Sequence, residues 1–210
     1  MFLFDEIFVK RWYNLDARPP SHATLLDIGA NIGYASLFFS VQSPTLRIHG
    51  YEPNPAAYSV LQRNVADNRL QSRMQVFPEA VGRAPGTLNL WVDVPTYLST
   101  GYLDHAPRQG GRRIPVPMVS LDDAWRRLNH GPIWLLKIDT EGAEPDILEG
   151  ASNALLEAVK HVLVETHDNI NPGALARCRQ VLERAGFSLC RVHLHPWNEA
   201  IIHAKRDVTH

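Results

Sequence analysis

The stretch from Leu25 to Ser36 constrains the fold of this chain more than any other. It begins as a short apolar run, turns sharply at Gly29, and continues in a helix-like pattern beyond Gly33. Glycine allows backbone angles and close approach that a side chain would forbid. A strand that passes through such a turn into a helix places backbone N–H groups at the helix start, where anions and other ligands bind. The stretch therefore predicts a strand, a ligand-binding turn and a helix in succession.

The next predicted strand indicates a nucleoside-containing ligand. Leu46 to Tyr51 is apolar and alternating, and it is followed by Glu52, Pro53 and Asn54. In doubly wound folds an acidic residue about 20 positions after the turn accepts hydrogen bonds from ribose hydroxyls. The alternative is an ordinary β–α–β crossover that ends in a surface glutamate. The complete unit of strand, turn, helix, strand and acid favours the cofactor site.

The turn differs from the dinucleotide fingerprint G-x-G-x-x-G. Residues 29–33 read Gly-Ala-Asn-Ile-Gly, with Asn31 where a pyrophosphate would need a second glycine. Asp27 adds a carboxylate, which would repel a pyrophosphate but could hold a cationic or hydroxyl-bearing ligand. Both features favour S-adenosylmethionine over NAD.

Composition narrows the class of protein. The chain has 210 residues, of which 45% are hydrophobic and 20% charged, and its formal net charge is -1. We expect one globular domain, 1–210, and no nucleic-acid partner, because there is no basic excess. Cys178 and Cys190 are predicted to be separate structural thiols. No apolar run could span a bilayer and the acidic start does not fit a signal peptide, so we expect a cytoplasmic protein without a membrane partner.

The alternation of strands and helices predicts the fold class. Ile133 to Ile138 is a nearly continuous apolar run, as expected of a strand buried on both faces. The last apolar runs, 187–194 and 200–205, predict a hairpin that makes the final strand antiparallel. We expect an α/β, doubly wound, Rossmann-like sheet of about seven strands. The aromatic residues of 1–20 predict an N-terminal helix packed on the sheet, with a lid over the site as the alternative.

Residues 93–118 are rich in proline and glycine and are predicted to form an irregular substrate loop. Long loops over a rigid scaffold often carry functional groups. The predicted acceptor-binding residues in this loop are Ser99, Thr100, Tyr102 and His105. Each of them, taken singly, also fits an ordinary solvated surface.

Polar side chains gather where two predicted strands end. Asp139 and Glu141 follow the buried apolar run, and His167 ends the next strand. In open α/β sheets, ligands bind outside the carboxyl ends of the strands. We therefore predict Asp139, Glu141 and His167 as catalytic residues, with His167 and Glu141 as the candidate general bases.

Other roles for these strand-end residues stay open. Lys137 is predicted to be buried, so Asp139 or Glu141 could be its structural ion-pair partner. His167 could simply bond a backbone carbonyl. Together with Asp168, these side chains could hold a divalent metal. Nothing in their spacing demands one, and no metal is expected.

Several segments match a known family. They read DIGANIG at 27–33, YEPNP at 51–55, EAVG at 79–82, VSLDD at 119–123, LKIDTEGAE at 136–144, LEGA at 148–151 and VE at 164–165. On these segments the chain resembles the FkbM-type methyltransferases, a branch of the class I S-adenosylmethionine-dependent enzymes. The segment at 136–144 is the most specific of them.

The resemblance implies methyl transfer, usually to oxygen, on sugars, glycans, polyketides or related secondary metabolites. S-Adenosylhomocysteine would be the product of the cofactor. The cofactor-binding residues that follow are Asp27, Gly29, Ala30, Asn31 and Gly33 at the aminoacyl end, Glu52, Pro53 and Asn54 at the ribose, Glu79 and Ala80 at the adenine, and Asp139 near the sulfonium.

Two other classes of protein are weighed against this one. Asn31 and the acidic turn argue against an NAD-binding oxidoreductase. A cofactor-binding partner subunit without catalysis would keep the same turn, so only product formation separates it from an enzyme. The apolar N-terminal segment could pack within the chain or across a homodimer.

Overall fold

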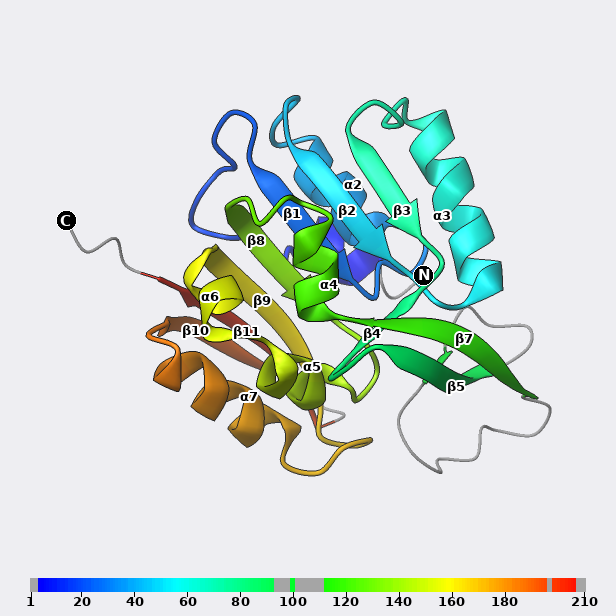
Figure 1. The fold of residues 1–210 in the computed structure, drawn as a ribbon. Coiled ribbons are helices and arrows are strands. Elements are labelled where there is room, and N and C mark those ends of the chain that lie inside the picture. Colours follow the sequence, from blue (N-terminus) through cyan, green and yellow to red (C-terminus); the bar gives the residue numbers. More distant parts are fainter. Residues whose placement is uncertain (1–3, 93–98, 101–111, 196–197, 207–210) are drawn as a thin grey trace.

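The main sheet of the protein has seven strands. A computed structural model describes residues 4–92, 99–100, 112–195 and 198–206. The strands of this sheet are β1 (Thr24–Ile28), β2 (Arg47–Tyr51), β3 (Met74–Phe77), β8 (Ile133–Ile138), β9 (Val159–His167), β10 (Ser188–His195) and β11 (Glu199–Lys205). Their order is β10-β11-β9-β8-β1-β2-β3 (Figure 1). In this sheet β11 runs opposite to the other strands. This confirms the predicted Rossmann-like sheet with an antiparallel last strand.

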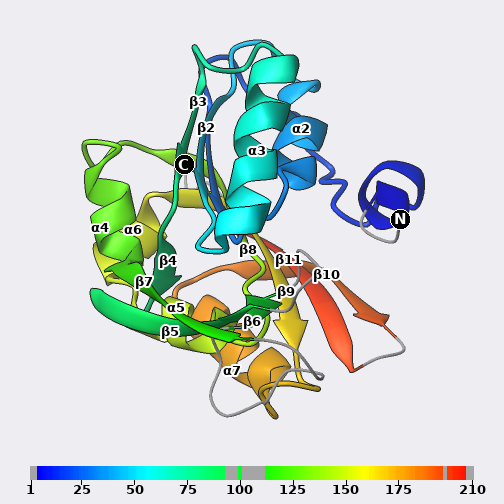
Figure 2. The same cartoon turned by 90° about the vertical axis from the view of Figure 1, so that its right-hand side faces the viewer.

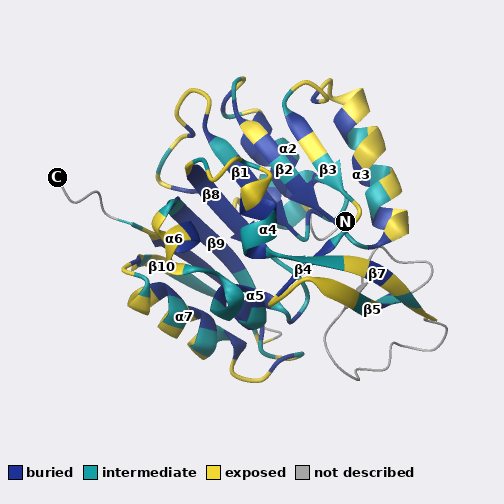
Figure 3. Ribbon diagram, in the orientation of Figure 1, coloured by how far each residue is buried: buried dark blue, intermediate teal, exposed yellow. Residues whose placement is uncertain are grey.

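Helices cover both faces of this sheet (Figure 2). α2 (Tyr34–Ser40) and α3 (Pro55–Asp67) lie on one face, and the other carries α4 (Leu121–Arg126), α5 (Glu144–Gly150), α6 (Asn153–Glu157) and α7 (Ala174–Arg184). Successive residues of β1 serve opposite faces, because side chains alternate along a strand. Leu25 packs in the cluster that contains Phe39 of α2, and Leu26 packs in the one that contains Leu148 of α5. The central strands are therefore buried on both sides (Figure 3).

A second, smaller sheet was not predicted. It comprises β4 (Ala80–Gly82), β5 (Gly86–Val92), β6 (Ser99–Thr100) and β7 (Arg112–Ser120), in the order β4-β7-β5-β6. The prediction of an irregular segment at 93–118 is wrong for residues 112–118, which pair with β5. Pro115 and Pro117 concealed this strand, since proline usually argues against one. They lie two positions apart and only β5 pairs along 112–117, so both nitrogens can face the open edge.

The N-terminal helix is shorter than the sequence predicts. It is a single π-helical turn, η1 (Asp5–Val9), and Arg11 then takes a positive φ of 56°. The segment packs through aromatic rings: Phe8 contacts Phe38 of α2, and Trp12 contacts His195 of β10. Among the described residues, no helix is both long and apolar enough to cross a membrane.

Candidate active site

The Gly-rich turn between β1 and α2 packs against the end of β8. Gly29 has a φ of +73°, and a Cβ atom there would lie 1.7 Å from the carbonyl oxygen of Asp139, so a side chain is excluded. The N–H groups of Gly29 and Ala30 both donate to the carbonyl of Tyr51, at 3.0 and 2.9 Å. Gly33, with a φ of 93°, then begins α2. The first two N–H groups of the turn thus join it to β2 instead of facing a ligand.

Glu52 closes the other side of the turn. Glu52 is 4% exposed, and its carboxylate accepts hydrogen bonds from the N–H groups of Asn31 (2.8 Å) and Asn54 (2.7 Å). Burial raises the pKa of Glu52 to about 7, although these hydrogen bonds oppose the shift. Asn54 caps α3 through its Oδ1, and its buried Nδ2 has no hydrogen-bond partner among the described residues. Glu52, Pro53 and Asn54 therefore lie where ribose contacts are predicted, and those contacts stay a prediction.

Lys137 is buried between carboxylates of β1 and β8. Its Nζ lies 3.1 Å from Asp27 Oδ1 and 3.5 Å from Asp139 Oδ2, and it donates to the carbonyl of Gly29 at 2.6 Å. Burial opposes the ammonium charge, but Asp27 and Asp139 outweigh it and raise the pKa of Lys137. Asp139 is one of the predicted partners of Lys137, and Asp27 proves to be the nearer one.

The imidazole of His167 lies among three carboxylates. Its Nδ1 is 3.0 Å from Glu144 Oε1, and its Nε2 is 3.7 Å from Glu141 Oε2 and 3.9 Å from Asp139 Oδ1. Burial disfavours the charged ring, but Glu144, Glu141 and Asp139 raise the pKa of His167 well above its usual value. Burial raises the pKa of Glu141 to about 7, although His167 opposes the shift. The structure thus brings the three predicted catalytic residues together, and the pKa of Glu141 suits a base near neutral pH.

Tyr13 and Glu165 belong to the same site and were not predicted. The Tyr13 hydroxyl donates to Glu165 Oε2 at 2.6 Å and lies 3.3 Å from Asp139 Oδ2. Burial is the main cause that raises the pKa of Glu165 to about 8, and Asp139 adds to it. A narrow pocket beside them is lined by Ile7 and Tyr13 of the N-terminal segment, by the Gly-rich turn, and by Lys137 and Asp139. The N-terminal segment therefore forms one wall of the candidate cofactor pocket.

The residues predicted at the adenine have protein partners. Glu79 forms a two-point ion pair with Arg127, at 2.5 and 3.1 Å, and the Arg127 guanidinium lies 4.6 Å from the centre of the Phe77 ring. Ala80 is buried in β4. Their role at an adenine ring stays a prediction.

Other predicted residues have partners of their own or lie outside the described part of the chain. Asp168 accepts hydrogen bonds from the N–H groups of Gly173 and Leu175 at the start of α7, so it supports that helix. Ser99 and Thr100 form β6, which pairs with the end of β5. Tyr102 and His105 lie outside the described residues.

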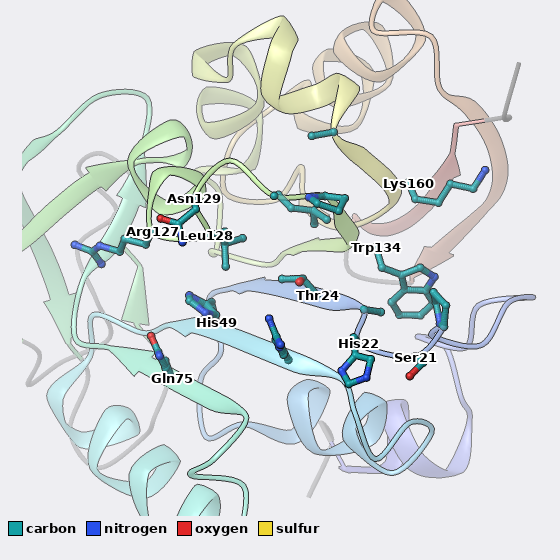
Figure 4. Close-up of a pocket in the computed structure, with 17 residues that line it drawn as sticks. Ser21, His22, Thr24, His49, Gln75, Arg127, Leu128, Asn129, Trp134 and Lys160 are labelled. Atoms are coloured by element: carbon teal, nitrogen blue, oxygen red, sulfur yellow. The ribbon is translucent and has the colours of Figure 1, made fainter.

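An open groove crosses the amino-terminal halves of the central strands (Figure 4). Its lining includes Thr24 of β1, His49 of β2 and Gln75 of β3, together with Arg127 and Asn129 after α4. None of the predicted site residues lines it. The groove is therefore separate from the strand-end site.

Fold and site together define a class I methyltransferase architecture. The chain is similar to the methyltransferase FkbM structure from Methylobacillus flagellatus KT, with a TM-score of 0.63 and 18% identity over 94% of this chain and 47% of that one. It is also similar to M. capricolum TrmK in complex with S-adenosyl-homocysteine, with a TM-score of 0.53 and 10% identity over 90% and 66% of the two chains. The chain thus spans about half the length of the first of these proteins. Both likenesses show the fold.

The family is shown by sequence. The model of the methyltransferase FkbM domain matches residues 27–189, so the chain belongs to that family. It is 31% identical over 218 residues to methyltransferase sdnD of Sordaria araneosa, covering 90% of this chain and 83% of that protein. It is 27% identical over 217 residues to 31-O-demethyl-FK506 methyltransferase FkbM of Streptomyces tacrolimicus, covering 90% and 82%. The predicted resemblance is confirmed, and the chain is a methyltransferase.

Proposed function

We propose that this methyltransferase transfers the methyl group of S-adenosylmethionine to a hydroxyl oxygen of a small molecule. The observation that carries the cofactor proposal is the charge around the Gly-rich turn, where Asp27, Glu52 and Asp139 gather. A pyrophosphate needs free N–H donors, and those of Gly29 and Ala30 already bond a backbone carbonyl. A ligand with an ammonium and a sulfonium group suits the carboxylates. These features support S-adenosylmethionine over the NAD of an oxidoreductase.

The acceptor proposal draws on the relatives. One relative is named 31-O-demethyl-FK506 methyltransferase, and this name places the methyl group on an oxygen. Another, the hexuronic acid methyltransferase AglP of Haloferax volcanii, is 25% identical over 148 residues, covering 70% of this chain and 57% of that protein. These names support a hydroxyl acceptor on a secondary metabolite, a sugar or a glycan.

The strand-end residues supply the remaining chemistry. The cofactor supplies an activated methyl carbon; the acceptor oxygen forms a bond to it as the carbon–sulfur bond breaks and its electron pair stays on sulfur. The hydroxyl proton must leave to a base. Glu141, with a pKa of about 7, is the proposed base, and Asp139 lies between Lys137 and His167 beside the turn. A positively charged His167 would hold the Glu141 carboxylate in place.

Methyl transfer with a labelled cofactor tests this proposal. The enzyme is incubated with trideuteromethyl S-adenosylmethionine and matched pairs of hydroxyl and amino acceptors: sugars, uronic acids and macrolides. Mass spectrometry should find the label on oxygen, and Glu141→Gln should lower the rate by about 100- to 10,000-fold. Label on nitrogen alone would contradict the oxygen acceptor. Cofactor binding without transfer to any acceptor would support a partner subunit instead.

A further inference from the structure

Asp139, Glu141 and His167 have the arrangement of a metal-ligand set. One oxygen or nitrogen from each lies within 4.8 Å of the others. The two carboxylates are 3.7 and 3.9 Å from His167 Nε2, too far for hydrogen bonds but close enough to share one ion between them. The residues come from loops and strand ends of two adjacent parallel strands, β8 and β9.

The orientation of His167 is an independent observation that points to a ligand. His167 is 3% exposed, and its Nε2 makes no hydrogen bond to any residue in the described ranges. Its Nδ1 is held by Glu144, a fully buried carboxylate that also accepts from the N–H groups of Thr140 and Gly142. Histidines that bind metals usually donate their other N–H to a carboxylate in this way, which turns the free nitrogen toward the ion. Glu144 therefore aims Nε2 at Asp139 and Glu141.

Further carboxylates lie beside this set of residues. Asp27 and Asp139 already flank Lys137, and Glu165 lies beside them with Tyr13 on its carboxylate. A divalent cation at this position would therefore lie among several carboxylates.

We propose that Asp139, Glu141 and His167 bind a divalent cation that holds the acceptor hydroxyl beside the cofactor. Two carboxylates and one imidazole suit ions such as Mn²⁺ or Zn²⁺. The role at the acceptor rests on the proposed function. One oxygen of Glu141 holds the ion and the other takes the hydroxyl proton, so its proposed role as the base is kept. The acceptor oxygen forms its bond to the methyl carbon, and the carbon–sulfur electron pair stays on sulfur.

Calorimetric titration of the chelator-treated full chain with Mn²⁺, and separately with Zn²⁺, tests the site. We expect one saturable site for at least one of these ions. His167→Asn keeps an amide N–H near the Nδ1 position for Glu144 and removes Nε2, so it should weaken binding at least tenfold. The control is Glu199→Gln, from a neighbouring set formed by Glu165, His195 and Glu199, and it should change the affinity less than twofold. If His167→Asn does not fold, Glu141→Gln replaces it with the same expectation.

Three outcomes of these titrations would count against the metal site or against the proposed function. Weaker binding in Glu199→Gln but not in His167→Asn would assign the ion to the neighbouring set and overturn the proposal. A folded chain that binds S-adenosylhomocysteine but neither ion would overturn it too, while leaving the proposed function intact. A chain that binds an ion but not S-adenosylhomocysteine would instead count against the proposed function.

Discussion

At the scale of single residues, Lys137 joins β1 to β8 at the candidate site. It contacts Asp27 and Asp139, and its side chain is 3% exposed. Lys137→Met would leave the buried Asp27 carboxylate and the partly buried Asp139 carboxylate without their cation. Removing one partner from a buried ion pair typically costs about 3–5 kcal/mol. We expect the free energy of unfolding in urea to fall by roughly that amount.

Lys10→Met is the matched control for this substitution. Lys10 pairs with Asp5 at the surface, where both side chains are 44% exposed. Such surface pairs contribute about 0–1 kcal/mol. Similar losses of stability in the two variants would contradict a special role for the buried lysine.

The raised pKa of Glu165 predicts how the free energy of unfolding depends on pH. Burial raises its pKa from 4.5 to about 8, so the folded chain holds this proton more tightly than the unfolded chain. The contribution of Glu165 is fully present below its unfolded pKa and is lost as the pH rises through about 8. We expect the free energy of unfolding to fall between about pH 4.5 and 8. Glu165→Gln, which cannot ionise but can still accept from Tyr13, should flatten this fall.

The control for the pH experiment is Glu183→Gln, since Glu183 is 54% exposed and pairs with Arg179 on α7. This variant should keep the wild-type slope. A Glu165→Gln variant with the same slope as the wild type would show that Glu165 is not the titrating group.

At the scale of elements, the N-terminal segment is fastened to the sheet by Tyr13. The hydroxyl bonds Glu165 of β9 at 2.6 Å, while Phe8 packs on α2. Tyr13→Phe keeps the ring and removes this bond, so the segment should open more often. We expect faster hydrogen exchange at residues 5–15 and weaker binding of S-adenosylhomocysteine. Tyr58→Phe, which loses the bond to the Val76 carbonyl and the one accepted from Gln62, should change neither. If both variants behave alike, Tyr13 does not hold a wall of the pocket in place.

The elements that the sequence predicts well are those with an uninterrupted pattern. β8 is one apolar run, and the turn after β1 is marked by its glycines. β7 was missed because Pro115 and Pro117 interrupt its pattern and its partner β5 lies beyond a long connection. η1 is shorter than predicted because ring contacts with α2 and β10 decide its course, and aromatic spacing alone does not reveal them.

Strand ends explain which site residues could be predicted. Asp139, Glu141 and His167 each follow an apolar run, and the rule that ligands bind at carboxyl ends of strands identified them. Tyr13 and Glu165 meet across 152 positions of sequence, and no local pattern joins them. The role of Glu144 was hidden for another reason: an acid in the first turn of a helix ordinarily serves the helix dipole.

At the scale of the whole molecule, the strand order places the site. From β1 the chain continues to β2 and β3 on one side, whereas β8 and β9 lie on the other side of β1. The strand order therefore reverses between β1 and β8. Open α/β sheets bind ligands at such a switch point. Asp27 of β1 and Lys137 of β8 are paired across this switch point. Glu52 follows β2, the strand that pairs with the other edge of β1. The position of the acidic pocket therefore follows from the topology of the sheet.

The central claim is that this pocket binds S-adenosylmethionine, and calorimetric titration with S-adenosylhomocysteine tests it most directly. NADH is titrated in parallel, and Glu52→Ala serves as the variant that lacks the predicted ribose ligand. The account predicts saturable binding of S-adenosylhomocysteine to the wild type, at least tenfold weaker binding to Glu52→Ala, and no binding of NADH. A folded protein that binds NADH and not S-adenosylhomocysteine would contradict it.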